Sequence, residues 1–402
     1  FLQTTFEDRL SELQKQGLFT PEETASLIKT NDRLLATVVQ PAYAALSEGL
    51  HSLETSTNAD STASETTTNA ASGKNNSAHN GLPKGLALLP DGKTYYLHLL
   101  FSETGSSRSE KELVQMLLTQ FQKEQSAIRS LASQSPSLIT LLSEENTAVF
   151  PLAEPEEMLS DLQARMKNDF PVSSPVPTVT VKDVVPSLEP YSAPAFYLTT
   201  PLGNSDNNVI YINHRNSSQG LELYTTLAHE GYPGHLYQTV YANQNIREPL
   251  LHLLSCGGYS EGWGTYAEIY SYSFDNGLAP GLGDLLAHNQ AATLGLYALL
   301  DININYEGWT KERTGKFLED LYGITDPAVV QEIYYAVADN PANYLQYYTG
   351  YMEITQMRET AEETLGSKYD PVQFHKFILD MGGAPFRVIK PYFKTWLLTF
   401  GT

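Results

Sequence analysis

Apolar residues recur three or four positions apart along most of the chain, which is the spacing of helices with one buried face. The clearest example runs from Glu110 to about Ala132. Residues 5–54 predict two more helices, the second beginning at Thr20-Pro21-Glu22-Glu23, where the threonine caps the helix and the acids meet its positive end. The chain after Gln219 has the same helical pattern, with Gly and Pro at the joints. We therefore predict a mainly α-helical protein.

The pattern changes between Pro171 and Asn213, where prolines separate short β-branched and aromatic runs. These runs are Thr178 to Val181, Ala195 to Thr199 and Val209 to Ile212. They predict a small mixed or antiparallel sheet within residues 176–213.

A segment with almost no large apolar residues divides the chain. From about Thr55 to Asn80 it consists mainly of Ser, Thr, Ala and Asn, which cannot bury enough surface to fold. We predict N-terminal helices in residues 1–54, a flexible insertion in residues 55–82 and one helical domain in residues 83–402.

Charge and composition exclude two classes of protein. The 402 residues carry a net charge of -21, which would repel a nucleic-acid backbone. No run approaches 18 apolar residues, so we expect no membrane-spanning segment. The Ser/Thr/Asn-rich stretch, the single Cys256 and the acidic charge favour a bacterial exported or envelope-associated protein. The first residue is Phe1 rather than Met, so we expect that the native N-terminus, and any export signal with it, is missing. A cytoplasmic location is the alternative.

The strongest chemical signal is His229-Glu230-Gly231-Tyr232-Pro233-Gly234-His235. Zinc peptidases place two histidines four residues apart on one helix, with the adjacent glutamate positioned to take a proton from water. Six residues separate these two histidines, or about 240° on an ideal helix. Pro233 and the two glycines can break the helix, so we interpret the motif as HExxH with a two-residue bulge. The alternative is two histidines at a helix end beside a Pro-Gly turn.

A third ligand is expected from a neighbouring helix. Glu261 follows His235 by 26 residues, enough for a helix, a turn at Cys256-Gly257-Gly258 and an antiparallel return. Glu268 lies two turns further on the same face and is expected to orient a ligand. The alternative is that Glu261 only stabilises a helix N-terminus by its charge.

The His229 to His235 motif, followed by Gln238 and by the Glu-Gly-Trp run at Glu261 to Trp263, resembles the bacterial domain-of-unknown-function 885 family. That family looks like the gluzincin metallopeptidases. It is similar in helical architecture to angiotensin-converting enzyme and the thermostable carboxypeptidases. The resemblance implies two helical lobes about a deep central cleft, with the small sheet beside the metal-binding helix.

Further residues match the family pattern. Tyr347 falls where the family has a tyrosine after a Pro-Gly-Gln run, and the resemblance implies that its hydroxyl donates to the oxyanion. Tyr344, Tyr351 and Arg358 share its helical face. Arg358 would hold a substrate carboxylate or an internal acid. The alternative for the tyrosines is helix packing.

Two asparagines are also candidate substrate-binding residues. The run Val209 to Asn213 matches the edge strand that similar enzymes lay antiparallel to a peptide. Asn305 stands where the family commonly has a histidine, and it can donate a hydrogen bond but cannot exchange a proton. A second departure is Leu236, where the family commonly has another histidine.

These observations predict a zinc-dependent peptide hydrolase of the oligopeptidase or carboxypeptidase type. His229, His235 and Glu261 would hold one Zn²⁺, Glu230 would act as general base and Tyr347 would stabilise the oxyanion. The alternatives are a metal-dependent amidase or deacylase acting on a non-peptide substrate, and a binding protein that kept the fold without turnover. Imidazole and carboxylate ligands also suit other divalent ions.

Overall fold

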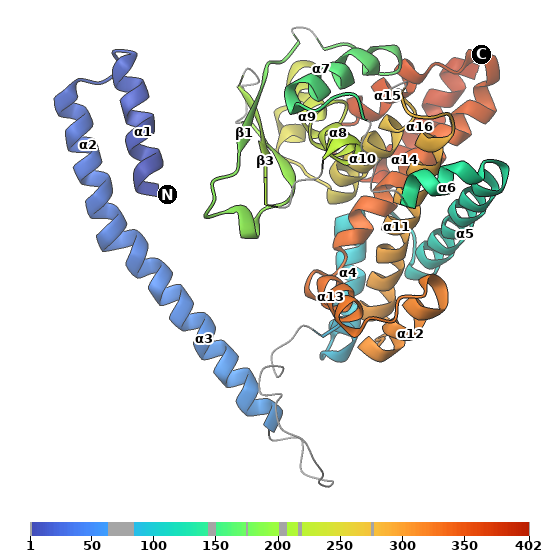
Figure 1. The fold of residues 1–402 in the computed structure, drawn as a ribbon, viewed down its shortest axis with the longest axis horizontal. Coiled ribbons are helices and arrows are strands. Elements are labelled where there is room, and N and C mark those ends of the chain that lie inside the picture. The colour runs from blue at the N-terminus through green and yellow to red at the C-terminus, as the bar shows by residue number, and fades with distance from the viewer. Residues whose placement is uncertain are drawn as a thin grey trace. The chain divides into compact units, whose positions relative to one another are not determined.

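The structure is a computed structural model that describes residues 2–62, 84–143, 150–173, 176–200, 207–215, 219–274 and 277–401. It divides into two units, Phe1–Leu82 and Pro83–Thr402 (Figure 1). The prediction of a mainly helical fold with a small sheet is confirmed. Within the described ranges, no helix combines the length and the apolar character needed to cross a membrane.

The first unit is helical in its described part. Its helices are α1 (Leu2–Lys15), α2 (Pro21–Leu34) and α3 (Gln40–Thr62), with a π-helical turn at Leu35–Val39. Thr20 accepts a hydrogen bond from the Glu23 N–H, and the Glu23 carboxylate accepts one from the Thr20 N–H, which confirms the predicted helix start. Helix α3 continues to Thr62, past the predicted end at residue 54. Of the predicted insertion, residues 63–82 lie outside the described residues.

The second unit contains the other helices and the sheet. The helices begin with α4 (Gly92–Thr104), α5 (Glu110–Gln134), α6 (Pro136–Ser143), α7 (Pro155–Arg165), α8 (Gly220–Glu230), α9 (His235–Asn245) and α10 (Gly257–Ser271). They continue with α11 (Leu282–Asn305), α12 (Lys311–Tyr322), α13 (Pro327–Asp339), α14 (Asn343–Leu365), α15 (Pro371–Asp380) and α16 (Phe386–Gly401). Short 3₁₀ turns lie at Leu86–Leu88, Met166–Asn168, Glu189–Tyr191, Pro249–His252 and Gly366–Lys368.

The sheet is mixed, which was one of the two predicted alternatives, and its strands lie within one or two residues of the predicted runs. They are β1 (Val179–Asp183), β2 (Ala195–Leu198) and β3 (Asn208–Ile212). The strand order is β1-β3-β2, with β1 parallel and β2 antiparallel to β3. The prediction that Val209 to Asn213 is an edge strand is therefore wrong. This segment lies in the centre of the sheet because both neighbours pair with it, and β2 is an edge strand.

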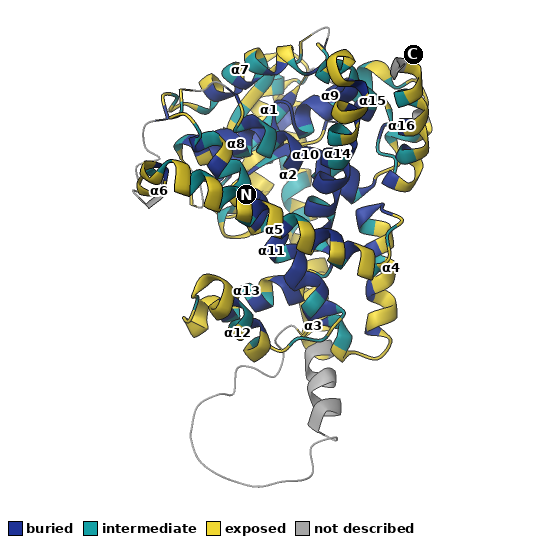
Figure 2. Ribbon diagram, turned by 90° about the vertical axis from the view of Figure 1, so that its right-hand side faces the viewer, coloured by how far each residue is buried: buried dark blue, intermediate teal, exposed yellow. Residues whose placement is uncertain are grey.

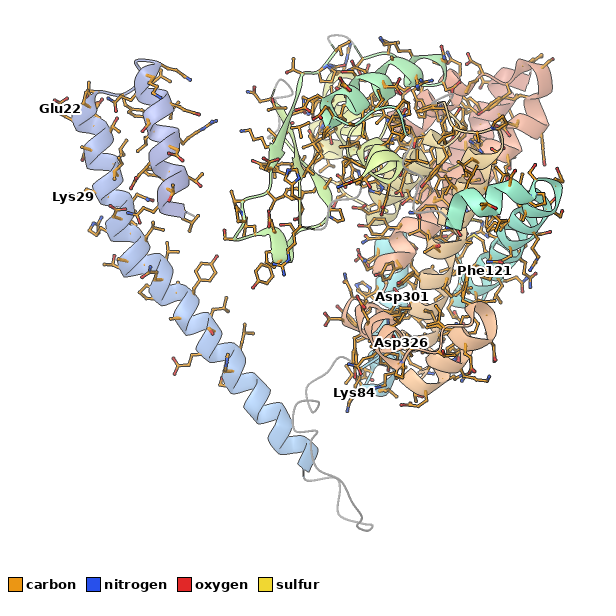
Figure 3. All side chains as sticks on the ribbon, in the orientation of Figure 1. Glu22, Lys29, Lys84, Phe121, Asp301 and Asp326 are labelled. Atoms are coloured by element: carbon orange, nitrogen blue, oxygen red, sulfur yellow. The ribbon has the colours of Figure 1, made fainter. Side chains whose placement is uncertain are left out.

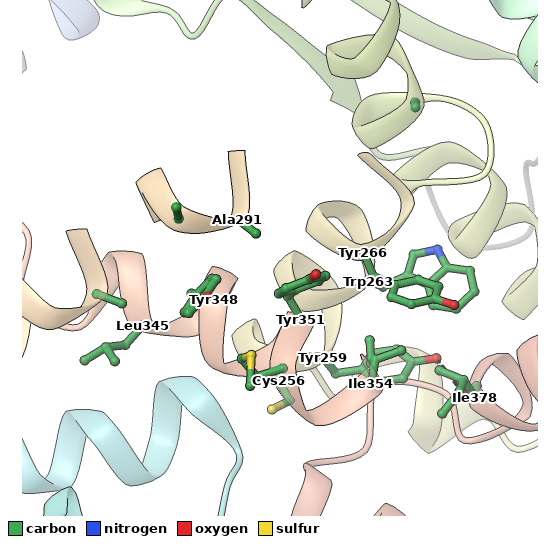
Figure 4. Packing of buried hydrophobic residues seen from close by; sticks show 14 of the residues in the cluster. Cys256, Tyr259, Trp263, Tyr266, Ala291, Leu345, Tyr348, Tyr351, Ile354 and Ile378 are labelled. Carbon is green, nitrogen blue, oxygen red and sulfur yellow. Dashed lines mark hydrogen bonds between the residues drawn. The ribbon is translucent and has the colours of Figure 1, made fainter. Parts of the chain in front are cut away.

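Helices α10 and α14 cross in the middle of the second unit, where their buried side chains form part of one large core (Figures 2 and 4). Gly262 and Gly350 mark the crossing. A Cβ on Gly262 would lie 2.4 Å from the Gly350 Cα, so the two backbones approach more closely than any larger residue permits. Trp263, Tyr348 and Ile354 are fully buried around this crossing. The crossing fixes Glu261 on α10 relative to Tyr347 on α14.

Candidate metal centre

The His229 to His235 motif lies where α8 ends and α9 begins. His229 and Glu230 are the last two residues of α8, and His235 is the first residue of α9. The helix is broken at the glycines and Pro233, as predicted, although the motif spans two separate helices rather than one bulged helix. The break brings the two imidazole rings to a centroid distance of 4.7 Å, at an angle of 83°.

Several contacts require small residues at this break. A Cβ on Gly234 would lie 1.8 Å from the carbonyl oxygen of His229, and one on Gly264 of α10 would lie 2.6 Å from the His229 ring. Only glycine fits either position. The indole N–H of Trp263 donates to the carbonyl oxygen of Pro233 at 2.9 Å, which ties the connecting segment to α10. The peptide bond between Tyr232 and Pro233 is cis.

Glu261 closes the group from α10. Its Oε2 lies 3.6 Å from the Nε2 of His229 and 3.4 Å from the Nε2 of His235. Ligand atoms of His229, Glu230 and His235 also lie within 4.8 Å of one another. Around a tetrahedral zinc with bonds of about 2.0–2.2 Å, ligand atoms lie about 3.3–3.6 Å apart. The spacing of these donor atoms therefore fits a single zinc-sized cation.

Glu268 contacts the other side of His229, as expected for a residue that orients a ligand. Its Oε2 lies 3.1 Å from the Nδ1 of His229, and its Oε1 accepts a hydrogen bond from the Gln290 amide at 2.7 Å. An ionised carboxylate only accepts hydrogen bonds, so Nδ1 carries the proton and donates it. The Nε2 lone pair then faces Glu261 and His235, which is the orientation that metal binding needs.

The centre has more negative than positive charge. Burial lowers the pKa of His229, but hydrogen bonds to Glu261 and Glu268 outweigh this effect and raise that pKa to about 10. Burial raises the pKa of Glu261, and the hydrogen bonds with His229 and His235 more than reverse this, so it lies well below its usual range. With neutral imidazoles, Glu230, Glu261 and Glu268 together attract positive charge, which a proton or a metal cation can supply.

The general-base candidate is held by the sheet. Glu230 Oε2 accepts a hydrogen bond from the backbone N–H of Tyr197 in β2 at 2.8 Å. Asn213 N–H donates to the carbonyl oxygen of Pro194, so residue 194 faces β3. Because backbone groups alternate sides along a strand, those of Ala195 and Tyr197 lie on the edge of β2 that faces away from β3, where Glu230 holds the Tyr197 N–H.

Tyr347 lies beside the histidines. Its ring centroid is 6.2 Å from that of His229. Burial raises the pKa of Tyr347, and the charge of Glu261 and a hydrogen bond with that carboxylate raise it further. The phenol therefore keeps its proton at neutral pH and can donate it in a hydrogen bond.

The remaining tyrosines and Arg358 are not brought to the histidines. Tyr344 packs against Tyr297 with ring centroids 4.7 Å apart. Tyr351 and Arg358 line a cavity of about 300 Å³ among α5, α10, α11 and α14. Arg358 lies over the ring of Tyr266 and 3.6 Å from Glu362. Glu362 is an exposed residue one turn further along the same helix.

Neither asparagine contacts the candidate metal centre, which corrects the expectation of substrate contact. The amide of Asn213 donates to the carbonyl oxygens of Glu189 and Ser192, at 2.8 and 2.9 Å, and the residue is fully buried. Asn305 is also fully buried, and its amide donates to Asp301 and to the carbonyl oxygen of Val337. Both side chains satisfy buried backbone groups, which is a structural role.

Two parts of the site were not found from the sequence. Gln290 comes from the middle of α11 and belongs to no motif that would single it out. The contact of the Tyr197 N–H is made by backbone, which carries no side-chain signal. Gly264 could have been found from the sequence. The glycines on both sides of Trp263 indicate that another chain segment approaches the helix closely there.

The fold and site define a mainly helical protein with a two-histidine, one-glutamate group beside a small mixed sheet. The chain matches the family described as "Bacterial protein of unknown function (DUF885)" over residues 2–391, and it belongs to that family. None of the curated proteins searched is similar enough to count as a match.

Two solved structures have a similar fold, and both are of proteins named "putative lipoprotein". The protein from Colwellia psychrerythraea has a TM-score of 0.76 and 23% identity, and the match covers 99% of this chain and 66% of that one. The protein from Shewanella oneidensis, of unknown function, has a TM-score of 0.56 and 17% identity, with 96% of this chain and 69% of that one covered. This chain therefore spans about two thirds of the length of each.

Proposed function

We propose that this protein is a zinc-dependent peptide hydrolase. The observation that carries the proposal is the position of Glu261 Oε2, 3.6 and 3.4 Å from the Nε2 atoms of His229 and His235. Two imidazoles and one carboxylate form a common ligand set of catalytic zinc, which leaves a fourth position open. The surplus negative charge around these groups supports binding of a cation.

His229, His235 and Glu261 would hold the ion. Bound zinc supplies Lewis-acid polarisation of the scissile carbonyl and makes a hydroxide nucleophile available near neutral pH. Glu230, oriented by the Tyr197 N–H, takes the proton from the attacking water and passes it to the leaving amine. Tyr347 donates its hydroxyl proton in a hydrogen bond to the oxyanion. Glu268 and Gln290 keep the His229 ring in the required orientation.

The free edge of β2 supports a peptide as the substrate. The backbone groups of Ala195 and the C=O of Tyr197 lie on this edge, beside the Tyr197 N–H that holds Glu230. An extended peptide can add to such an edge as a further strand. In this proposal β2 takes the substrate-positioning role that the sequence assigned to Val209 to Asn213.

The finer relationships also belong to the proposal. We infer that the protein is a gluzincin-like metallopeptidase, related in architecture to angiotensin-converting enzyme and the thermostable carboxypeptidases. The names of the two similar structures support an exported or envelope-associated protein. A helical enzyme with a cleft between two lobes would accept short or unstructured peptides.

A metal-dependent digestion tests the proposal. The full chain is purified, loaded with zinc and analysed for its metal content by mass spectrometry, then incubated with a mixed peptide library with and without a chelator. We expect about one zinc per chain and cleavage that the chelator abolishes. A zinc-loaded protein that leaves every peptide intact would overturn peptide hydrolysis, and a chain that takes up no zinc would overturn the metal site.

A further inference from the structure

The cavity of about 300 Å³ among α5, α10, α11 and α14 is separate from the candidate metal centre. Its wall on α10 is formed by residues that share one side of the helix, namely Tyr266, Ile269, Tyr270 and Ser273. Glu261 and Glu268 lie beside the histidines on a different side of α10. A molecule in this cavity would therefore not contact the metal centre.

Arg358 supplies a positive charge to the cavity. Its Cζ lies 5.5 Å and 5.6 Å from the ring centroids of Tyr266 and Tyr270, which hold the guanidinium in place. Nη1 donates to the hydroxyl of Tyr266 at 3.3 Å, and Nε is buried. Nη2 has no acceptor among the described residues and, unlike Nε, is not one of the buried atoms. Its N–H groups can therefore donate to a ligand.

Most other charged groups that line the cavity pair with one another. Lys123 Nζ lies 2.8 Å from Glu359 Oε1, and His288 Nδ1 lies 2.5 Å from Glu124 Oε2. Asp284 differs from these residues. It is exposed in the first turn of α11, and its carboxylate has no partner among the described residues. The charged groups with free hydrogen-bonding capacity are thus one guanidinium and one carboxylate.

This distribution of charge disfavours ligands of a single sign. A phosphate-like dianion would approach the carboxylates of Glu124 and Asp284, and a simple cation would approach Arg358. Burial raises the pKa of Tyr351, the charge of Glu124 raises it further, and the charge of Arg358 lowers it. Charges of both signs therefore act on this wall of the cavity, and they favour a ligand that also carries both.

We propose that this cavity binds a small zwitterion of the size of a free amino acid or a dipeptide. The ligand carboxylate accepts hydrogen bonds from Nη2 of Arg358, and its ammonium group pairs with Asp284. An apolar side chain of the ligand lies against Ile269, Ala287 and the ring of Tyr351, which also line the cavity. The site uses no residue of the metal centre, so it does not depend on the proposed hydrolysis.

The first test compares ligands that differ in one charge. EDTA-treated full chain is titrated with L-leucine and with leucyl-leucine by isothermal titration calorimetry, and each is compared with its N-acetyl form and its C-terminal amide. We expect a zwitterion to bind at least about tenfold more tightly than either modified form, because each modification removes one charge-assisted hydrogen bond. L-Leucine should bind zinc-loaded chain equally well, since the cavity is separate from the metal.

The second test locates the binding in the cavity. Arg358→Gln and Asp284→Asn each remove one charge, and Ala287→Leu fills space without changing a charge. Each should weaken binding of the zwitterion at least about tenfold. Arg129→Gln, at an exposed position of α5, is the matched control for Arg358→Gln and should leave binding unchanged. Circular dichroism verifies that each variant is folded, and Ala287→Leu retains the test if Arg358→Gln does not fold.

Each outcome decides for or against the site. Binding that needs both charges and is lost in the cavity variants would support it, whether or not the protein cleaves peptides. Absence of binding by both L-leucine and leucyl-leucine would overturn it. Equal binding of the modified forms would overturn the zwitterion as the ligand. Binding that the three cavity substitutions leave unchanged would place the zwitterion elsewhere and overturn the cavity as its site.

Discussion

Two buried polar clusters in the second unit use similar groups and differ in where these groups point. In the candidate metal centre, the donor atoms of His229, His235 and Glu261 converge on a space of the size of one cation. In the Asp301 cluster (Tyr96, Asp301, Asn305 and Ala342), the donors converge on a single carboxylate oxygen. Asp301 is labelled in Figure 3.

The contrast separates groups placed for a ligand from groups placed for folding. The Tyr96 hydroxyl, the Asn305 amide and the Ala342 N–H all donate to Asp301 Oδ1, at 2.7, 3.2 and 3.0 Å. Ala342 has a φ of 66° and precedes α14, so the cluster holds this helix start in a left-handed turn. The cluster thus supports the helix that carries Tyr347, while the donor atoms of the candidate metal centre are left to face a ligand.

The largest expected effect is on catalysis. Glu230→Gln keeps the shape of the side chain and removes the general base, so kcat/KM for peptide hydrolysis should fall about 10³- to 10⁴-fold. Steady-state kinetics and metal analysis of the same preparation check this. Zinc content should remain at one per chain, and a variant with more than a tenth of the wild-type activity would contradict the assigned role.

The Asp301 cluster should respond to substitution in stability. Asp301→Ala leaves three buried donors without an acceptor, which should lower the free energy of unfolding by about 3–5 kcal/mol. Urea denaturation followed by circular dichroism measures this change. Asp301→Asn retains one carbonyl acceptor and should cost less, so equal losses in the two variants would show that the Oδ1 contacts are not what matters.

The carboxyl group of Asp301 should also make the free energy of unfolding depend on pH. Burial raises the pKa of Asp301 to about 7, although the hydrogen bonds it accepts act in the opposite direction. Between the unfolded value near 3.8 and the folded value near 7, the folded state holds the proton more tightly. This contribution to stability is complete at low pH and is lost as the pH rises, by about 1.4 kcal/mol per unit within that range.

Denaturation of wild type and Asp301→Asn from pH 4 to pH 8 checks this dependence. The difference in unfolding free energy between the two proteins should be largest at pH 4 and should shrink as the pH rises. A difference independent of pH would mean that Asp301 titrates as it does in the unfolded chain.

The smallest effect is expected at Gln290, which contacts the candidate metal centre only through Glu268. Gln290→Leu removes the hydrogen bond to Glu268 and leaves that carboxylate freer to turn from His229. Zinc affinity should weaken about 10-fold to 100-fold, measured by competition with a chromogenic chelator. Gln115→Leu is the control and should leave the zinc affinity unchanged. An unchanged zinc affinity in Gln290→Leu would contradict the role of Gln290 in supporting the metal centre.

The sequence predicted those features that are encoded locally. The capping residues Thr20 and Glu23, the strand runs and the helix break at Pro233 follow from turn chemistry and side-chain periodicity. The approach of His229 to His235 could be inferred because their spacing requires a broken helix to bring them together.

The errors come from interactions between distant segments. The pairing of β3 with both of its neighbours depends on strand order, which the local pattern of Val209 to Asn213 does not encode. Asn213 was assigned to the substrate from its place at the end of the predicted edge strand, and Asn305 from its place at a family histidine. Neither argument reveals that their partners are buried backbone groups. Gln290 was missed for the same reason.

The contact between Gly262 and Gly350 limits how α10 and α14 can move. Backbones this close cannot separate without exposing the core around Trp263 and Tyr348. The positions of Glu261 and Tyr347 relative to each other are therefore fixed. Under the proposed function, an opening that admits a peptide would therefore have to come from elsewhere than the α10–α14 crossing.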